Sequence, residues 1–433
     1  MGAGSTVFAK NVLGDVLLTP ALKDELVIAL YDIDGKRLEE SFIVIDKLNK
    51  KYNKNKAVIL KYLGVKERRN ALKDAKFVVN AIQVGGYEPS TVIDFEIPKK
   101  YGLRQTIGDT LGIGGIFRGL RTIKVMKEFA EDIEAVCPDA LFLNYSNPMA
   151  ILSGYMQRYT KVNTVGLCHS VQVCVSSLYE TLGIEKPQIG SELIAGINHM
   201  AWLLELKDKN GNDLYPEIRR LAKLKNQEKH HNMVRLDYID KFGYYCTESS
   251  EHNAEYNPYY IKNRYPELIE KFNIPLDEYP RRCVSQINSW EKQKEEILNG
   301  GDIIHERSRE YASRIMEAVV TDTPYKIGGN VINHGLITNL PQNACVEVPC
   351  LIDGNGVHPT FVGDLPLQCA CLNATNVNPQ LLTIEAAVTG KKDTVYQAAM
   401  LDPHTAAELS LDDIKAMCDE LIEAHKKAGF PVL

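Results

Sequence analysis

Short apolar runs alternate with helical patterns along the first third of the chain. In the runs most consecutive positions are apolar, as in strands buried on both faces, whereas the segments between them repeat apolar residues every three or four positions. Strands are predicted at residues 26–31, 57–62, 77–83, 140–144 and 162–167. Helices are predicted at residues 35–48, 70–75 and 110–135. This alternation is typical of an α/β fold with a parallel sheet.

The pattern changes after about residue 190. Sheet is predicted at residues 193–206, 331–340 and 344–352, and helix at residues 215–238, 287–298, 307–320 and 382–427. Strands and helices are grouped here rather than alternating, which is typical of α+β architecture. We therefore expect two domains: an α/β domain at residues 1–190, and an α+β domain at residues 191–433 for substrate binding and oligomerisation.

Composition and charge exclude several classes of protein. The chain has 433 residues, of which 45% are hydrophobic and 24% charged, and its formal net charge is −6. That balance is typical of a folded globular protein and offers no basic patch for nucleic acid. No stretch approaches the roughly 20 apolar residues of a membrane span, and we find no secretion signal, so we expect no membrane partner. Ten scattered cysteines without paired spacing indicate reduced thiols and a cytoplasmic location.

A glycine turn near the N-terminus is a candidate dinucleotide site. Gly2, Gly4 and Ser5 precede a helical pattern, and glycines in such a turn let backbone N–H groups approach a pyrophosphate. Asp32 follows the first predicted strand, where an acid can accept hydrogen bonds from the adenosine ribose of NAD. A helix-capping turn beside a solvent-facing acid explains these residues equally well. The first strand of such a domain is missing, since no apolar run precedes Gly2.

Longer motifs carry a specific resemblance. They are Gly85-Gly86-Tyr87-Glu88, Asp109-Thr110-Leu111-Gly112, Asn144-Tyr145-Ser146-Asn147-Pro148-Met149-Ala150, Gly166-Leu167-Cys168-His169-Ser170-Val171 and Gly196-Ile197-Asn198-His199-Met200. With these motifs the chain closely resembles glycoside hydrolase family 4 over nearly its whole length. The segment that begins at Cys168 resembles the melibiase branch, whose members are α-galactosidases.

The resemblance implies a Rossmann-like first domain that binds NAD, and a divalent cation, usually manganese, held by Cys168 and His199. It also implies hydrolysis by oxidation at C3 of the sugar, proton removal at C2 and elimination of the aglycone. The chemistry agrees, because proton removal beside a ketone needs a Lewis acid, and a thiolate with an imidazole suits a borderline metal. Without the motifs, a buried structural Cys and His would be the commoner explanation. Family members usually form dimers or tetramers, so a homo-oligomer is expected.

Further residues receive roles from the same reasoning. His169 follows Cys168 and is a candidate general acid for the departing group, and a purely hydrogen-bonding role is nearly as well supported. The Asn147 amide can bind vicinal sugar hydroxyls, and Asn144 is a candidate nicotinamide contact, although Asn residues in turns usually fix the turn. Asp109 is a candidate to contact substrate or to orient a metal ligand. Arg282 is a candidate substrate contact, and a surface ion pair is the commoner role for such an Arg.

The base that removes the C2 proton is expected in the segment 244–256, which is dense in ionisable side chains. The family resemblance implies a Tyr or Asp base in roughly this region. Four candidates stay open: Glu248, Glu251, His252 and Tyr256. At least two of them are expected to be surface or supporting groups.

The favoured function is an NAD- and metal-dependent α-galactosidase whose substrates are galactosides such as melibiose. Three alternatives are kept. They are a family 4 glycosidase for a glucoside, glucuronide or galacturonide, an NAD-dependent hydroxyacid dehydrogenase, and a truncated, non-catalytic sugar-binding protein. A dehydrogenase would not need Cys168 beside His199, and the missing first strand supports the last alternative.

Overall fold

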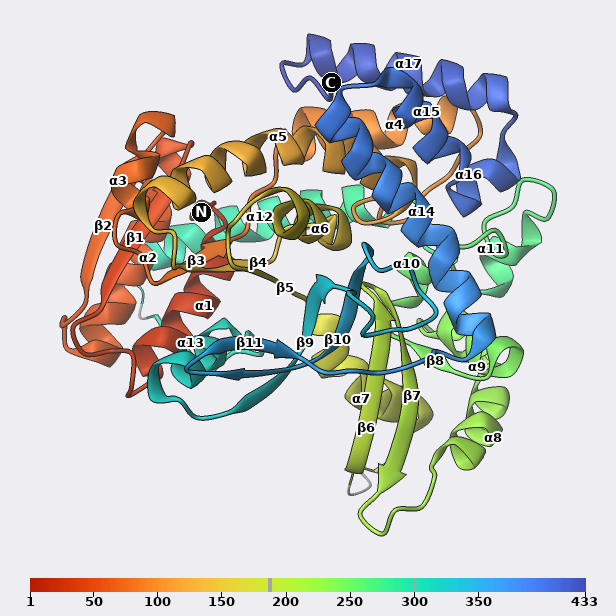
Figure 1. Ribbon diagram of the computed structural model, residues 1–433, viewed down its shortest axis with the longest axis horizontal. Helices are drawn as coiled ribbons and strands as arrows, with labels where there is room; N and C mark the ends of the chain where they lie inside the picture. The colour runs from red at the N-terminus through yellow and green to blue at the C-terminus, as the bar shows by residue number, and fades with distance from the viewer. Residues whose placement is uncertain (186–188, 299–300, 302) are drawn as a thin grey trace.

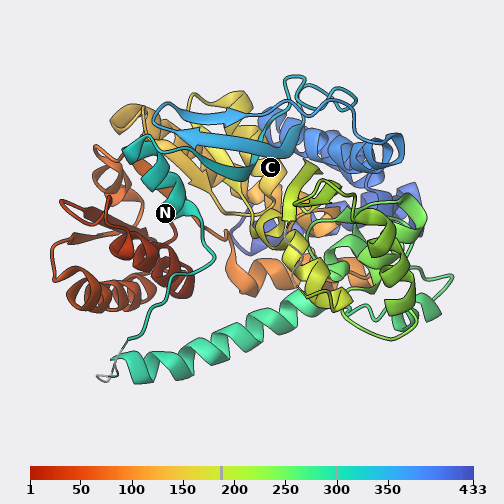
Figure 2. The ribbon, with the colours of Figure 1, turned by 90° about the horizontal axis from the view of Figure 1, so that it is seen from below.

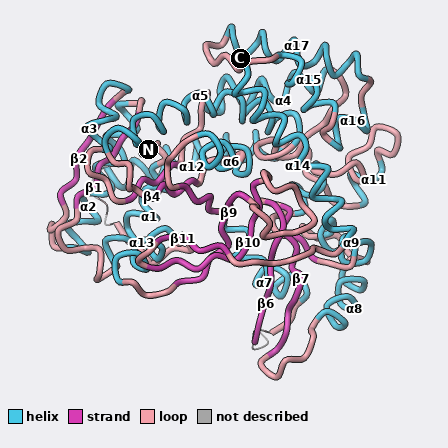
Figure 3. Tube along the Cα trace, viewed as in Figure 1, coloured by secondary structure: helices cyan, strands magenta, loops and turns pink. Residues whose placement is uncertain are grey.

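A computed structural model of the chain describes residues 1–185, 189–298, 301 and 303–433. The strands in these residues form two sheets (Figures 1 and 3). The smaller sheet pairs β1 (Val27–Asp32) and β2 (Val58–Leu63) in parallel. The larger sheet has the order β3-β4-β5-β9-β10-β6-β7-β8, and β11 pairs with β10. Its strands are β3 (Phe77–Asn80), β4 (Leu141–Asn144), β5 (Thr164–Leu167), β6 (Ile189–Ile197), β7 (Met200–Asp208), β8 (Tyr245–Cys246), β9 (Tyr325–Ile332), β10 (Cys345–Asp353) and β11 (Gly356–Pro359).

Helices cover both sheets and gather at one end of the molecule. There α14–α17 lie together with α4 and α5 (Figure 1), and α12 runs along one side as a long helix (Figure 2). The α-helices are α1 (Thr6–Leu18), α2 (Gly35–Asn53), α3 (Arg68–Leu72), α4 (Val92–Lys100), α5 (Gly112–Val136), α6 (Met149–Tyr159), α7 (His169–Leu182), α8 (Tyr215–Lys225), α9 (Met233–Phe242), α10 (Ser250–Glu255), α11 (Glu267–Lys271), α12 (Glu278–Leu298), α13 (Ala312–Thr321), α14 (Leu367–Thr389), α15 (Lys392–Met400), α16 (Pro403–Glu408) and α17 (Leu411–Lys427). Short turns of 3-10 and π helix lie at Val65–Glu67 and Gly86–Thr91.

The N-terminal residues lie between β1 and β3. The Met1 ammonium group donates to the Val79 carbonyl (2.8 Å), and the Ala81 N–H donates to the Met1 carbonyl (3.1 Å). The Ala3 N–H donates to the Tyr31 carbonyl (3.0 Å). These bonds join the two strands only at their carboxyl ends. The larger sheet therefore begins at β3, and β1 with β2 forms a separate sheet.

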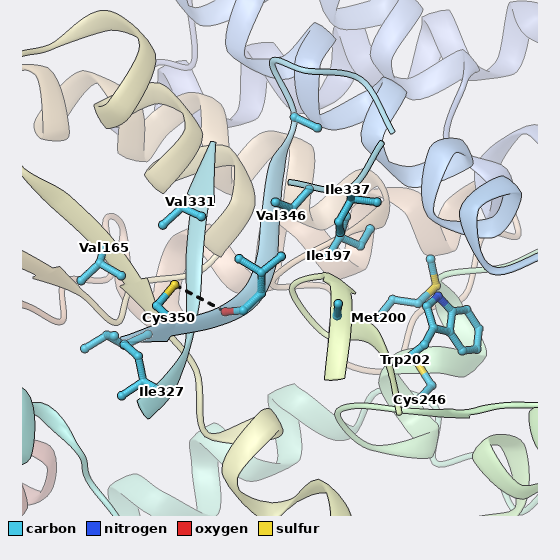
Figure 4. Close-up of a cluster of buried hydrophobic side chains, with 14 of the residues drawn as sticks. Val165, Ile197, Met200, Trp202, Cys246, Ile327, Val331, Ile337, Val346 and Cys350 are labelled. Atoms are coloured by element: carbon cyan, nitrogen blue, oxygen red, sulfur yellow. Dashed lines mark hydrogen bonds between the residues drawn. The ribbon is translucent and has the colours of Figure 1, made fainter. Parts of the chain in front are cut away.

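The main hydrophobic core lies where β5, β9, β10 and the β6–β7 hairpin meet (Figure 4). Val165, Val331 and Val346 are buried there, and Trp202 is fully buried with its indole N–H donating to Asn373 Oδ1 (3.2 Å). Side chains packed from all these strands fix the end of β5 relative to the β6–β7 turn. The core thus holds together two segments that are distant in the sequence.

Several predicted elements differ from the structure: the helical region at residues 382–427 is divided among α14–α17, and the helix predicted at residues 307–320 begins only at Ala312. The helix predicted at residues 215–238 is divided into α8 and α9, because Asn226 ends α8 and its side-chain amide donates to the Met233 carbonyl (3.0 Å). The strand predicted at residues 331–340 is wrong in position, since β9 ends at Ile332. There the Asn333 amide donates to the carbonyls of Ile337 (2.8 Å) and Leu340 (3.0 Å), which closes a turn instead of a strand.

The larger sheet crosses the expected domain boundary. Strand β9 comes from the C-terminal part of the chain and pairs directly with β5 of the N-terminal part. The boundary at residue 190 therefore marks a change in the sequence pattern but does not divide the larger sheet. The two-domain division stays a prediction. None of the described helices combines the length and the apolar character that a bilayer span needs.

Candidate active site

Three potential metal ligands meet beside the larger sheet. Cys168 follows β5, His199 lies in the turn between β6 and β7, and Glu248 follows β8. One donor atom from each, a sulfur, a ring nitrogen and a carboxylate oxygen, lies within 4.8 Å of the other two. A set of thiolate, imidazole and carboxylate suits a divalent transition-metal ion better than calcium or magnesium, which prefer oxygen ligands alone. The residues present therefore fit the metal that the family resemblance implies.

One row of residues across the sheet connects the two ligand segments. Gly166 pairs with Asn330, Asn330 with Glu347, and Glu347 with Gly196. The Asn330 amide donates to Glu347 Oε1 (3.0 Å), and the Asn198 amide donates to the same oxygen (3.5 Å). Burial raises the pKa of Glu347 to about 7. This buried polar row was not predicted, because no local pattern relates residues on four separate strands.

The backbone at two of the candidate ligands is left-handed. The φ angles of His199 and Glu248 are 64° and 62°. Residues other than glycine rarely adopt this conformation, which costs roughly 1–2 kcal/mol per residue. Such strain persists only where the surrounding structure imposes it, and it clusters at functional sites. The sharp β6–β7 turn thus supports a functional placement of the His199 ring.

The charges around His199 favour a bound cation. Burial disfavours a charged ring, but the neighbouring Cys168 and Glu248 outweigh it and raise the pKa of His199 to about 10. Burial also raises the pKa of the Glu248 carboxyl, yet His199 and His252 outweigh this and hold it below its ordinary value. The surroundings of this imidazole therefore favour a positive charge close to Cys168 and Glu248.

A second group of polar side chains adjoins the ligands. Asp109, His199 and His252 also offer donor atoms within 4.8 Å of one another. The Asn147 amide donates to Asp109 Oδ2 (3.2 Å), and the Thr110 hydroxyl donates to Asp109 Oδ1 (2.7 Å). Asp109 and Asn147, both expected to contact substrate, are therefore side by side next to the candidate metal ligands. Their roles stay predictions.

His169 begins α7 directly after Cys168. Its Nε2 lies 2.7 Å from Glu310 Oε2, and its ring lies 6.0 Å from that of Tyr145. The imidazole is 40% exposed, whereas the Glu310 side chain is 9% exposed. Among the candidate proton donors and acceptors, His169 thus has the most exposed side chain.

The four candidate bases occupy different positions. The Tyr256 hydroxyl lies 3.1 Å from His199 Nδ1, and Glu248 belongs to the ligand group. His252 Nδ1 lies 2.7 Å from the Ser249 hydroxyl, and its Nε2 lies 3.8 Å from Asp109 Oδ1. Burial lowers the pKa of His252, against the opposing effect of the neighbouring Glu248. Glu251 instead forms an ion pair with Arg282.

Two further candidates have contacts that favour supporting roles. Arg282 pairs with Glu251 and with Glu278 Oε1 (3.0 Å), and its side chain is 42% exposed. Asn144 is fully buried, and its amide donates to the Ser146 carbonyl (3.2 Å) and to the Ser153 hydroxyl (3.1 Å). These contacts assign Arg282 to an ion pair and Asn144 to fixing a turn. Direct contacts with substrate and nicotinamide stay predictions.

Two buried charged residues beside the site were missed. The Arg118 guanidinium donates to the Tyr279 hydroxyl (3.3 Å) and, against the effect of burial, helps to hold the pKa of Asp109 below its ordinary value. The Glu255 carboxylate accepts from the backbone N–H groups of Thr106 (2.7 Å) and Gly108 (2.8 Å), just before Asp109. Glu255 adjoins Tyr256 in the acidic segment, so its position was a usable signal. No feature of the sequence indicated Arg118, because it lies within an ordinary amphipathic helix.

The glycine turn has the geometry of a dinucleotide site. A Cβ at Gly2, whose φ is 74°, would lie 2.7 Å from the Ala81 carbonyl oxygen, and one at Gly4 would lie 2.8 Å from Asp32 Oδ2. The Gly4 N–H donates to that Asp32 oxygen (2.6 Å). Helix α1 starts immediately afterwards, and the Ser5 side chain does not cap it. Uncapped N–H groups at a helix start, beside an acid at a strand end, fit the pyrophosphate and ribose of NAD.

The fold and the site together define a class of protein: an α/β protein in which a dinucleotide-type turn is combined with a thiolate–imidazole metal-ligand cluster. Comparison with known families gives the particular family. Residues 1–184 match "Family 4 glycosyl hydrolase", and residues 194–405 match "Family 4 glycosyl hydrolase C-terminal domain". The chain belongs to family 4 of the glycosyl hydrolases, which confirms the resemblance seen in the sequence.

Individual relatives agree with this assignment. An alpha-galactosidase of Bacillus subtilis (strain 168) is 63% identical over 98% of this chain and 97% of its own length. An alpha-galactosidase of Rhizobium meliloti (strain 1021) is 34% identical over 99% of this chain and 88% of its own. A solved 6-phospho-alpha-glucosidase from gut microorganisms, in complex with NAD and Mn2+, has a TM-score of 0.80 at 23% identity and covers 99% of this chain and 97% of its own. This structural similarity confirms the predicted fold class.

Proposed function

We propose that the protein is an NAD- and divalent-metal-dependent α-galactosidase that hydrolyses α-galactosides such as melibiose. The observation that carries the proposal is the group of Cys168, His199 and Glu248, centred on the buried His199, in a family 4 chain. The choice of galactose is supported by 63% identity to an alpha-galactosidase over nearly the whole chain. Solved relatives that hold NAD and Mn2+ support the cofactors.

When bound, NAD would accept the hydride from C3 of the sugar as the C3 hydroxyl is oxidised, and the divalent cation would supply a Lewis acid for the ketone. The protein's residues bind the sugar and move protons. Asn147 and Asp109 form one hydrogen-bonded pair that can receive vicinal sugar hydroxyls. His169, the most exposed of the candidate proton donors and acceptors, is the proposed acid for the aglycone.

The base is proposed to be His252 or Tyr256. Both side chains are buried next to His199. The ring centroids of His252 and His199 lie 5.0 Å apart, and the Tyr256 hydroxyl lies 3.1 Å from His199 Nδ1. Glu248 is one of the proposed ligands, and Glu251 forms an ion pair with Arg282. Excluding those two leaves the His252 imidazole, or Tyr256 as a phenolate, to accept the C2 proton, although burial raises the pKa of Tyr256 well above its ordinary value.

A neutral sugar suits the charges of the site better than a phosphorylated one. Phosphate recognition uses unpaired Arg or Lys side chains that can make charge-assisted hydrogen bonds. Here Arg282 is paired with two carboxylates, and Arg118 donates to the Tyr279 hydroxyl and is close enough to Asp109 for their charges to interact. We therefore propose that the galactose is not phosphorylated.

A substrate panel tests this function. With NAD, manganese and a reductant present, kcat/KM for melibiose should exceed that for the matching α-glucoside by about 100-fold or more, since a site built to bind one hydroxyl rejects a misplaced one. The galacturonide and the galactoside 6-phosphate should be equally poor substrates. Absence of galactoside hydrolysis under these conditions would overturn the proposal, and preference for the phosphorylated sugar would overturn the neutral specificity.

We also propose a cytoplasmic homo-oligomer. All ten cysteines are free, including the candidate ligand Cys168, and free thiols persist in a reducing compartment. Phe361 and Leu367, close in sequence, are 72% and 74% exposed. Large exposed apolar side chains support a protein–protein contact at this surface.

A further inference from the structure

A carboxylate fixes the orientation of the proposed acid. His169 Nε2 lies 2.7 Å from Glu310 Oε2, and the Glu310 side chain is almost buried. The imidazole can rotate only by leaving a carboxylate that has little access to water, which costs more than losing a solvated hydrogen bond. One ring nitrogen is therefore held, and Nδ1 is the nitrogen that can serve a ligand.

The chain around Glu310 is itself fixed on both sides. Ser308 donates to the buried Asp15 of α1 from its N–H (2.9 Å) and from its hydroxyl (2.6 Å), and the Glu310 N–H donates to the Ser308 hydroxyl (3.1 Å). On the other side, the Tyr311 hydroxyl donates to the Cys168 carbonyl (3.0 Å). One short segment thus contacts the helix that follows the glycine turn and the residue that precedes His169.

We propose that Glu310 is a positioning residue that aims the His169 imidazole at the aglycone oxygen, an inference that rests on the proposed function. In the elimination, the proposed base takes the C2 proton, the C2–H electron pair forms the C1=C2 bond, and the C1–O bond breaks with its pair on the aglycone oxygen. That oxygen takes the proton held at His169 Nδ1, while His169 Nε2 keeps its contact with Glu310. Glu310 does not touch the substrate, and none of its own bonds forms or breaks.

Leaving groups of different basicity test this role. A p-nitrophenolate needs little proton assistance, whereas the sugar alkoxide released from melibiose needs it fully. In Glu310→Gln, the amide keeps the size of the side chain but holds the imidazole less firmly. We expect kcat/KM for melibiose to fall by about 100-fold, the lower end of what general acid catalysis contributes. The value for p-nitrophenyl α-galactoside should stay near that of the wild type.

Three controls separate positioning from a structural role. Glu306→Gln alters an exposed carboxylate of the same segment and should leave both substrates unaffected. His169→Ala should give the same dependence on the leaving group, and adding Glu310→Gln to it should cause no further loss, since the two residues act as one unit. NAD and manganese affinities, measured by titration calorimetry, should match the wild type.

An equal loss on both substrates, or weaker NAD binding by Glu310→Gln, would show that Glu310 serves the fold or the cofactor and would overturn the proposal. Additive losses in the double variant would overturn it as well. If the wild type hydrolyses neither galactoside, the proposed function fails, and this inference fails with it.

Discussion

Replacement of Cys168 by serine should remove nearly all manganese-stimulated hydrolysis. The Cys168 sulfur is one of three donors within 4.8 Å of one another, and a serine hydroxyl does not ionise to replace a thiolate. Loss of a ligand should weaken metal binding by more than the roughly 10–100-fold that altered supporting residues cost. The measurement is manganese affinity by titration calorimetry, with kcat at saturating galactoside.

Cys371 provides the matched control. It is a free and exposed cysteine, so Cys371→Ser should leave manganese affinity and kcat unchanged. Wild-type activity should also require a reductant, because an oxidised Cys168 cannot bind the metal. A Cys168→Ser enzyme with the manganese affinity and activity of the wild type would show that the thiolate is not a ligand.

The second large effect is expected on stability, at a buried ionic group that joins α4, α5 and α17. Arg121 donates to Asp94 from both terminal nitrogens (3.1 and 2.6 Å), and His425 Nε2 lies 2.9 Å from Asp94 Oδ1. The side chains are 0–3% exposed. Asp94→Asn leaves the Arg121 charge buried without an anion, which should lower the free energy of unfolding by about 3–5 kcal/mol. Urea denaturation followed by circular dichroism measures it.

Two further variants test whether the buried, unpaired charge causes the loss of stability in Asp94→Asn. The double variant Asp94→Leu with Arg121→Met removes both charges and should recover much of the stability, because an apolar pair of similar volume avoids the desolvation cost. Lys100→Gln breaks an exposed pair with Glu420 and should change stability by less than about 1 kcal/mol. A change of that small size in Asp94→Asn would contradict the account of the buried group.

The parts of the fold that depend on neighbouring residues in the chain could be predicted from the sequence. The strands before Asp32, Asn144 and Cys168 were predicted because each is a continuous apolar run, and the glycine turn was predicted because glycine has a distinctive conformational role. The motifs around Cys168 and His199 identified the family. The structure adds that the donor atoms of these two residues lie close enough to share one ion.

Contacts between distant segments could not be predicted. Glu310 lies 141 residues from its partner His169, and Glu347 lies 149 residues from Asn198. Such pairs depend on the sheet order, in which β9 and β10 are inserted between β5 and β6. A propensity pattern contains no information about this order. Long-range pairing therefore decided which of the clustered acids face the site and which, like Glu251, form ion pairs at its edge.

The most direct test of the proposed elimination follows the hydrogen at C2 of the sugar. The enzyme is given melibiose deuterated at C2 of the galactose, in ordinary water with NAD and manganese, and the released galactose is analysed by mass spectrometry and proton NMR. If C2 is deprotonated, the product should carry hydrogen from solvent at C2, and NAD should be needed without net formation of NADH. Complete retention of deuterium at C2 in the galactose would contradict proton abstraction, and the elimination mechanism with it.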